Sequence, residues 1–336
     1  MLNIISKSYV SNKISGPKKV VDNLIKGLEK INYPYCINKS LDSTSQLWIH
    51  DDKKALKKAS ELNIKAVVGP NLYITPREIP KELNLDNVVY IHPSKWAMDF
   101  WKDFGFDRCK LDYWPTGIDT DFFKERDKDN ANEVLVYFKE RYPEELDYVE
   151  KILEEKNIKY EIIHYGNYKE KDYIDKLNKT KYIIWVGRQE SQGIALQEAM
   201  SMNIPILVWD VKNIGHWVNS KKHKIFNKDE LSYENTSSAY FFNEDCGIKT
   251  KIKTEIPEKI NYMESEWKSF SPRKFIIDNL NLEKQAKELL LLYQKYFNIF
   301  FEDGSAESSK NTKKWENDKI IFKLKTKIKD LIKRLV

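Results

Sequence analysis

The chain has 336 residues, of which 41% are hydrophobic and 13% aromatic; it can bury sizeable cores, and this excludes a chain disordered throughout. Its length favours two domains over one. The net charge of +6 resides in residues 306–336, which hold ten Lys or Arg against four Asp or Glu. The first 305 residues are therefore neutral overall, and we expect no nucleic-acid groove in the core.

Cysteine and histidine usage argues against a metal or disulfide framework. The three cysteines are scattered, and neither they nor the five histidines show metal-ligand spacing. Residues 1–6 resemble a first strand rather than a signal peptide, and no apolar run approaches the length of a membrane span. We therefore expect a cytoplasmic protein.

The N-terminal part alternates short apolar runs with helical patterns, which is typical of a parallel α/β sheet. The expected strands are 3–6, 47–49, 66–68 and 88–92, with helices over 20–28, 53–62 and 95–104. Gly16 precedes the first helix in a loop where a backbone can approach a ligand, or it is a structural loop glycine. His50 ends a strand, where ligands sit in open α/β sheets; alternatively it caps or packs.

A turn and a charged segment mark the boundary between the two expected domains. Residues 115–119 (Pro-Thr-Gly-Ile-Asp) predict a tight turn, and residues 124–133 are charged without apolar periodicity, as in a linker. A strand over 134–138 then opens the second domain and is followed by two cations, Lys139 and Arg141.

The stretch 182–210 combines two apolar runs, a glycine-containing loop and a short helix. The runs 182–186 and 204–209 predict buried parallel strands, with a helix from about 194 to 202 between them. Gly193 permits close backbone approach, and the helix N-terminus offers N–H groups to an anion. With Glu190 before the helix and Glu198 inside it, this unit suits a ligand that carries a phosphate with hydroxyls on both sides, such as a sugar nucleotide.

The segment from Glu190 to Met200, followed by Pro205 and an apolar strand, resembles the glutamate-pair motif of retaining, family 4-like glycosyltransferases of the GT-B fold. The turn at 115–119 is similar to the signature that ends the first domain of that family. The resemblance implies an α/β fold of two Rossmann-like, doubly wound domains that face a cleft. It divides the chain into an acceptor-side domain (1–123), a linker (124–133), a nucleotide-sugar-binding domain (134–270), crossover helices that return to the first domain (271–299), and a linker with a basic tail (300–336).

The resemblance also implies roles for the residues around the helix start. Glu190 and the adjacent loop and helix amides, at Gln192, Gly193 and Ile194, would hold the transferred sugar and assist departure of the leaving group. Glu198 would bind the ribose hydroxyls.

Further roles follow from the same resemblance at other strand ends. Gly16 would belong to a glycine-rich loop and His50 would lie near the reacting sugar, while Gly166 would contact the nucleotide base. Tyr168 would stack on that base, or it is an exposed turn tyrosine. Lys139 and Arg141 would neutralise the pyrophosphate, although their spacing departs from the family's glycine–arginine pattern; the alternative is that both are solvated surface residues.

The last residues combine an apolar stripe with lysines. Within 319–336 one face holds the apolar residues Ile321, Leu324, Ile328, Leu331, Ile332 and Leu335. Such a basic amphipathic helix can lie on an anionic membrane, which would make the protein peripheral at the inner face. The alternative is a helix that docks on its own protein or on a partner.

We therefore predict a glycosyltransferase that moves a sugar from a nucleoside-diphosphate sugar to a hydroxyl of a glycan or lipid-linked acceptor, with retention of configuration. Glycan, glycolipid or polysaccharide synthesis is the expected setting. No cofactor or metal is expected, because the GT-B fold generally needs no metal in its site. The main alternative is a catalytically silent sugar-nucleotide-binding protein tethered by its tail. An epimerase of the same fold would need acid/base carboxylates that the sequence does not present.

Overall fold

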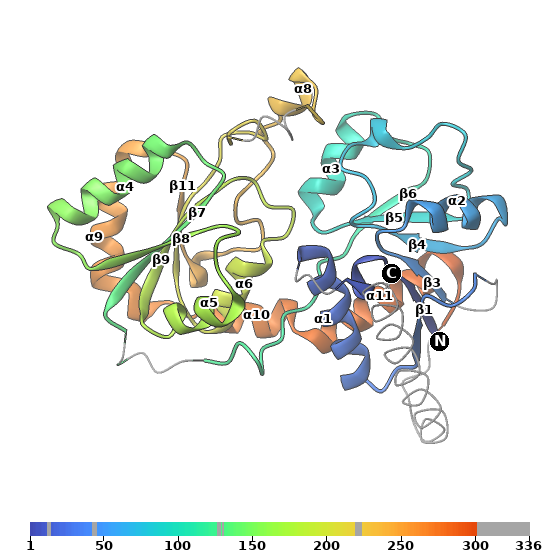
Figure 1. The fold of residues 1–336 in the computed structure, drawn as a ribbon, viewed down its shortest axis with the longest axis horizontal. Coiled ribbons are helices and arrows are strands. Elements are labelled where there is room, and N and C mark those ends of the chain that lie inside the picture. Colours follow the sequence, from blue (N-terminus) through green and yellow to red (C-terminus); the bar gives the residue numbers. More distant parts are fainter. Residues whose placement is uncertain (12–14, 42–45, 126–128, 130, 219–223, 301–336) are drawn as a thin grey trace, which may run out of the picture. The chain divides into compact units, whose positions relative to one another are not determined.

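The computed structural model describes residues 1–300 apart from 12–14, 42–45, 126–128, 130 and 219–223 (Figure 1). The predicted membrane-binding segment 319–336 lies outside the described residues. The chain forms two compact units. Unit 1 comprises Met1–His92, Phe106–Gly117 and the described residues from Leu282 onward, and unit 2 comprises Pro93–Gly105 and Ile118–Asn281.

Unit 1 is built on a six-stranded parallel sheet with the order β2-β1-β3-β4-β5-β6. Its strands are β1 (Leu2–Ile5), β2 (Tyr35–Ile37), β3 (Gln46–Ile49), β4 (Ala66–Val68), β5 (Val88–His92) and β6 (Lys110–Tyr113). Its α-helices are α1 (Gly16–Lys30), α2 (Lys53–Glu61) and α11 (Leu282–Phe297). Every residue of β1, β3, β4 and β5 is buried, as expected for parallel strands covered on both faces.

Helix α1 begins one turn earlier than its apolar pattern indicates. The side chain of Ser15 accepts a hydrogen bond from the Lys18 amide, and Pro17 stands in the first turn, where its missing N–H costs nothing. Gly16 is therefore the first helical residue, and its predicted place in a loop is wrong. The expected apolar stripe is buried, and Gly27 lies on it against the start of α11.

Unit 2 is built on a five-stranded parallel sheet with the order β11-β10-β9-β7-β8. Its strands are β7 (Glu133–Lys139), β8 (Tyr160–His164), β9 (Thr180–Gly187), β10 (Ile206–Trp209) and β11 (Gly247–Thr250). Its α-helices are α3 (Lys95–Asp103), α4 (Pro143–Glu155), α5 (Glu170–Leu177), α6 (Ile194–Ser201), α8 (Lys228–Leu231), α9 (Ile256–Glu266) and α10 (Pro272–Leu280).

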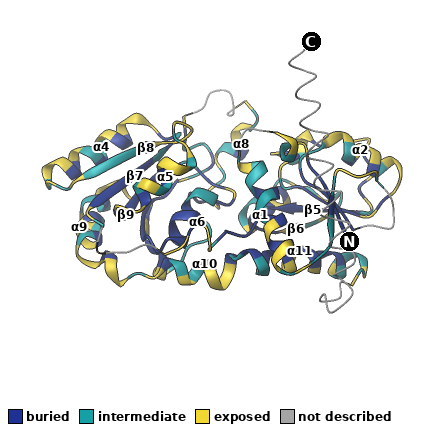
Figure 2. Cartoon of the chain, turned by 60° about the horizontal axis from the view of Figure 1, so that its bottom comes forward, coloured by how far each residue is buried: buried dark blue, intermediate teal, exposed yellow. Residues whose placement is uncertain are grey.

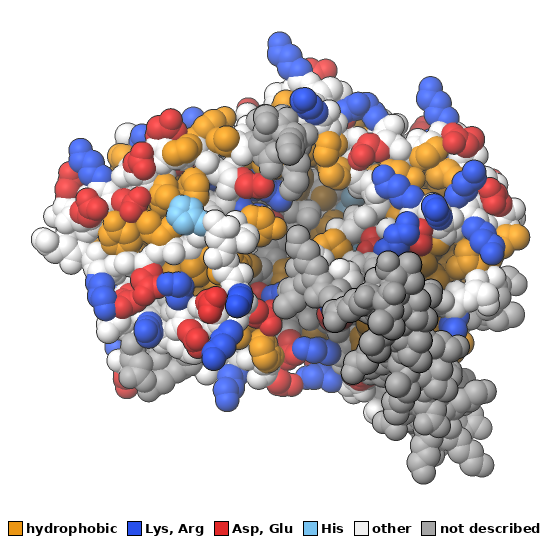
Figure 3. Space-filling view, in the orientation of Figure 1, with side chains coloured by type: hydrophobic (Ala, Val, Ile, Leu, Met, Phe, Trp, Pro, Cys, Tyr) orange, Lys and Arg blue, Asp and Glu red, His pale blue; other side chains and the backbone are white. Residues whose placement is uncertain are grey.

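Alternate residues of the central strands in unit 2 contribute to two separate hydrophobic cores, one on each face of the sheet. On one face, Val134 and Val136 of β7 join the apolar sides of α4 and α9. On the other face, Leu135 and Tyr137 join α5, α6 and α10. The central strands β7, β9 and β10 are almost entirely buried, the edge strands β8 and β11 are partly exposed, and the helices expose their outer sides (Figure 2). Figure 3 shows that basic and acidic side chains are interspersed on the visible surface.

The predicted α/β architecture is confirmed, but several elements went unpredicted. These are the strands β2, β6 and β11, which have three or four residues each, and the helices α8 and α9. Of the two helices within the expected crossover segment 271–299, α10 belongs to unit 2, whereas α11 belongs to unit 1. Within the described residues, no helix is both long and apolar enough to cross a membrane.

Replacing Gly27 with Ala should destabilise unit 1. An added Cβ would lie 2.5 Å from the Leu282 carbonyl oxygen, a backbone atom that cannot move without shifting α11. We expect a loss of about 1–3 kcal/mol in the free energy of unfolding, measured with urea. Gly16→Ala in the same helix is the matched control, because its Cβ would meet nothing within 4 Å. Equal stability of both variants would contradict this packing of Gly27 against α11.

Candidate functional site

The carboxyl ends of three neighbouring strands in unit 2 bring charged and aromatic side chains together. Lys139 ends β7, Tyr165 follows β8 and Arg188 follows β9. Backbone bonds hold these ends in place: the Arg188 amide donates to the Lys139 carbonyl at 2.9 Å, and the Tyr165 amide donates to Phe138 at 2.9 Å. This edge is where parallel α/β sheets bind ligands.

Lys139 and Glu190 form a buried ion pair at this edge. Their side chains are 9% and 11% exposed, and the Lys139 ammonium also lies 4.0 Å from the ring centre of Tyr165. Burial lowers the pKa of Lys139 from its usual range, and the Glu190 carboxylate opposes that shift. The structure thus joins two predicted site residues that are 51 positions apart in the sequence.

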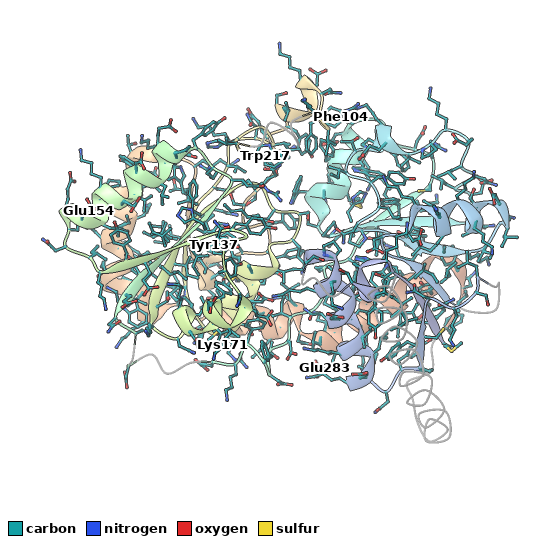
Figure 4. All side chains as sticks on the ribbon, in the orientation of Figure 1. Phe104, Tyr137, Glu154, Lys171, Trp217 and Glu283 are labelled. Atoms are coloured by element: carbon teal, nitrogen blue, oxygen red, sulfur yellow. The ribbon has the colours of Figure 1, made fainter. Side chains whose placement is uncertain are left out.

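Arg188 is a second cation at the same edge, and it was not predicted from the sequence. Its guanidinium donates to Glu140 at 2.5 Å and to the Gln189 carbonyl at 2.7 Å. It also lies 5.1 Å from the ring centre of Trp217, a residue that Figure 4 labels. The sequence could have indicated its position, because a basic residue that directly follows the apolar run 182–186 and Gly187 must lie at the carboxyl edge of the sheet. The site therefore contains two cations, each paired with a carboxylate.

The loop from Glu190 to α6 has the shape that its glycine permits. Gly193 is the N-cap of α6 at φ 86°, a left-handed conformation that favours glycine. Gln192 stands before it and donates to the side chain of Gln197 at 2.9 Å, and both residues are buried. Ile194 opens the helix, so the N–H groups of its first turn point toward this loop.

Glu198 lies in the second turn of α6 and is 2% exposed. The main chain of Glu190 is fixed on both sides: its amide donates to the Ser237 carbonyl at 2.9 Å, and its carbonyl accepts from the indole of Trp96 at 3.0 Å. These hydrogen bonds hold the loop that leads into α6 in place.

Arg141 does not take the predicted pyrophosphate position. It is 1% exposed, and its donors serve the protein itself. It binds the Glu145 carboxylate through Nε at 2.8 Å and Nη2 at 2.5 Å, and its Nη1 donates to the Gly187 and Trp209 carbonyls. The alternative of a solvated surface residue is wrong for Arg141, because two residues beyond the end of β7 the chain turns this side chain into the interior.

Glu145 connects this buried guanidinium to His216. The His216 Nδ1 accepts from the Lys212 amide at 3.2 Å, so its Nε2 carries the proton that it donates to Glu145 at 3.0 Å. Burial alone would raise the pKa of Glu145, but the hydrogen bonds from His216 and Arg141 and the Arg141 charge lower it to about 2.

Gly166 and Tyr168 lie in the turn after β8, as predicted. Gly166 is exposed at φ 86°, and no atom lies within 4 Å of the position that a Cβ would take there. Tyr168 is half-buried rather than exposed: its hydroxyl lies 2.9 Å from that of Tyr137, and its ring is 5.3 Å from that of Tyr173. Tyr173 in turn donates to the Ala195 carbonyl in the first turn of α6, so Tyr168 borders the helix start.

His50 belongs to unit 1 and serves the start of α1. It is fully buried, and burial lowers its pKa to about 4, so the ring is neutral at pH 7. Its Nε2 donates to the Pro17 carbonyl at 3.0 Å, beside Gly16. His50 therefore packs in the core and caps the helix, which is the alternative that the sequence left open for it. Its hydrogen bond holds the first turn of α1. This arrangement does not favour the predicted contact with a reacting sugar.

Metal-ligating side chains are not clustered in the part of the chain that the structure describes. Among those residues, no group of three or more His, Cys, Asp or Glu is placed to hold a metal ion.

Comparison with solved structures identifies the fold. Sucrose-phosphate synthase from Thermosynechococcus elongatus superposes with a TM-score of 0.55 at 10% identity, covering 88% of this chain and 99% of that one. HepE from Anabaena, solved in complex with UDP, gives 0.52 at 12% identity, covering 88% and 99%. The lipopolysaccharide outer core galactosyltransferase WaaB gives 0.50 at 10% identity, covering 87% and 99%.

The chain has the GT-B glycosyltransferase fold. The two parallel sheets of six and five strands match the two Rossmann-like units of the GT-B fold, so the fold prediction is confirmed. No protein-family model matches the sequence, and no curated protein matches it significantly. At identities of 10–12%, the likeness concerns the GT-B fold alone.

The Glu145 network predicts a pH-dependent contribution to the stability of unit 2. Because the folded pKa of about 2 lies below the ordinary value of 4.5, ionised Glu145 stabilises the fold above about pH 4.5, and this contribution disappears as the pH falls toward 2. Glu145→Gln should lower the free energy of unfolding by about 3 kcal/mol at neutral pH. The difference in this free energy between the variant and the wild type should narrow as the pH falls from about 4.5 toward 2.

Urea unfolding followed from pH 7 to pH 2.5 measures this gap. The exposed neighbour Glu144 supplies the control variant, Glu144→Gln, which should follow the wild type. A gap between Glu145→Gln and the wild type that stays constant with pH would contradict the assigned network.

Proposed function

We propose that this protein transfers a sugar from a nucleoside-diphosphate sugar to a hydroxyl group of a glycan or lipid-linked acceptor, with retention of configuration. The single observation that supports this best is the buried Lys139–Glu190 pair at the carboxyl edge of the unit 2 sheet. It places a cation and a carboxylate beside the start of a helix, where a diphosphate and sugar hydroxyls would each find a partner.

The proposal gives each residue of this edge one role. Lys139 and Arg188, with the first-turn amides of α6, would bind the diphosphate and stabilise the charge that develops as it leaves. Glu190 would accept hydrogen bonds from hydroxyls of the transferred sugar, with Gln192 and Gly193 shaping the loop. Glu198 would bind the ribose, and Tyr168, with Gly166 in the same turn, would lie toward the base.

The similar folds support the reaction class. One is named a synthase of sucrose phosphate, another is a galactosyltransferase, and HepE was solved in complex with UDP. The binding of UDP by a protein of the same fold makes nucleoside diphosphates the natural first probes.

We also propose that no metal ion takes part, since the protein supplies two cationic side chains at the place where the diphosphate would bind. Transfer should therefore persist in EDTA. Membrane binding by residues 319–336, with a cytoplasmic location at the inner face, stays a prediction from the sequence, which sedimentation with anionic vesicles would test.

Glu190→Gln should tighten the binding of nucleoside diphosphates while it lowers sugar transfer. In the free protein the Glu190 carboxylate forms an ion pair with the Lys139 ammonium, so a diphosphate that binds Lys139 must compete with Glu190. Removing that charge should lower the Kd of the best binder among UDP, GDP and ADP about tenfold, equivalent to about 1.4 kcal/mol. Transfer should fall at least tenfold, because the neutral amide oxygen of glutamine binds the sugar hydroxyls more weakly than the carboxylate does. Lys139→Met should weaken diphosphate binding.

The matched control is Glu264→Gln. Glu264 pairs with Lys181 at the opposite end of β9, so this variant changes the net charge equally but away from the site. Isothermal titration calorimetry should show no tightening for the control. Weaker diphosphate binding by folded Glu190→Gln would contradict the proposed competition, and a wild type that binds no nucleoside diphosphate would contradict the function.

A second candidate keeps the binding and drops the transfer. It is favoured by one observation: Arg141 is committed to the interior, and the cations Lys139 and Arg188 are both engaged by carboxylates of the protein. A silent binder would bind nucleotide sugars without breaking them. Slow release of the free sugar from the donor in the absence of acceptor would support the transferase, and its absence in a protein that binds the donor would support the silent binder.

A further inference from the structure

Asp210 is a buried carboxylate at the end of β10 that the proposed chemistry does not use. It is 3% exposed. Its Oδ1 accepts hydrogen bonds from the Val211 amide at 2.9 Å and the Ser238 amide at 2.6 Å, and its Oδ2 accepts from the Ser237 hydroxyl at 2.9 Å. The carboxylate therefore organises the loop 236–239, which lies 26 residues further along the chain.

The same loop binds the segment that carries Glu190. The Ser238 hydroxyl donates to the Gly187 carbonyl at 3.0 Å, and the Ser237 carbonyl accepts from the Glu190 amide at 2.9 Å. A continuous chain of hydrogen bonds thus runs from the Asp210 carboxylate to the main chain of Glu190.

We propose that Asp210 is a positioning residue for Glu190, acting through Ser237 and Ser238. A side chain that must meet a sugar hydroxyl has to be held within about 0.5 Å, and a loop reaches that precision only when its backbone is anchored. Hydrogen bonds to a charged acceptor are the stronger kind, so a buried carboxylate anchors a loop more firmly than a neutral group. This inference rests on the proposed function of Glu190.

The geometry distinguishes positioning from simple packing. An apolar residue at position 210 would fill the space, yet it would leave the Ser238 amide and the Ser237 hydroxyl without their acceptor. The loop would then lose the orientation in which the Ser237 carbonyl faces Glu190. Gly187, by contrast, also accepts from Arg141, so the segment keeps one anchor when Asp210 is removed. We therefore expect loosening of the Glu190 segment within a protein that still folds.

The test compares Asp210→Ala with Asp210→Asn. The asparagine Oδ1 can still accept from both amides, and its Nδ2 can donate to the Ser237 oxygen, so Asp210→Asn should retain the loop and rescue the effect. Asp210→Ala should speed hydrogen exchange of the Glu190 amide at least tenfold. It should also lower kcat for release of sugar from the donor about tenfold or more, with the Kd for UDP changed less than twofold.

Thr180→Val is the control for lost stability. The Thr180 hydroxyl donates to the Lys176 carbonyl at 2.8 Å, so this variant loses a partly buried hydrogen bond at the start of β9, the strand that leads to Glu190, away from the site. It should lower the melting temperature without changing Glu190 exchange or kcat.

Two results would overturn the positioning role. One is unchanged exchange of the Glu190 amide in Asp210→Ala, and the other is an equal change in Thr180→Val. Amide exchange needs no substrate, so its outcome is independent of the proposed function. If exchange changes as expected while the wild type neither binds a nucleoside diphosphate nor releases sugar, the positioning inference survives and the proposed function fails.

Discussion

The unit 2 site depends on one buried interaction, the contact of the Arg141 guanidinium with three separate elements. It binds Glu145 on α4 and the carbonyls of Gly187 and Trp209 at the ends of β9 and β10. Both carbonyls lie where the pairing of their strands comes to an end. A buried charge is tolerated only when its hydrogen bonds are satisfied, and here they tie together the strand ends from which the loops of the site emerge.

The charged side chains at the carboxyl edge of the unit 2 sheet are paired with one another. Lys139 is paired with Glu190, and Arg188 with Glu140. The local charge is therefore neutral without a ligand, which allows the two cations to be buried or half-buried at modest cost. An anionic ligand would enter by exchanging these partners. The same pairing that stabilises the free protein would thus set how tightly a diphosphate binds.

Two buried charges of opposite sign hold the segment between β9 and α6. Arg141 bonds Gly187, the last residue of β9, and the loop organised by Asp210 bonds both Gly187 and Glu190. Gly193 completes the arrangement by allowing the turn into α6. Rigid support beneath a short loop is the arrangement expected where a side chain has to meet a ligand in one orientation.

The sequence by itself determined the α/β architecture, the central strands and the loop from Glu190 to Gly193, because apolar periodicity and glycine act over a few residues. It did not reveal short polar strands such as β6, whose pairing is set by neighbours. Only the tertiary structure decided that Arg141 turns inward, that His50 bonds the start of α1, that Arg188 pairs with Glu140 at the carboxyl edge of the sheet, and that Asp210 bonds the loop 236–239. The physical reason is that burial and hydrogen bonding of a charge depend on partners far away in the chain: Arg141 meets carbonyls 46 and 68 residues away, and no local pattern records such contacts.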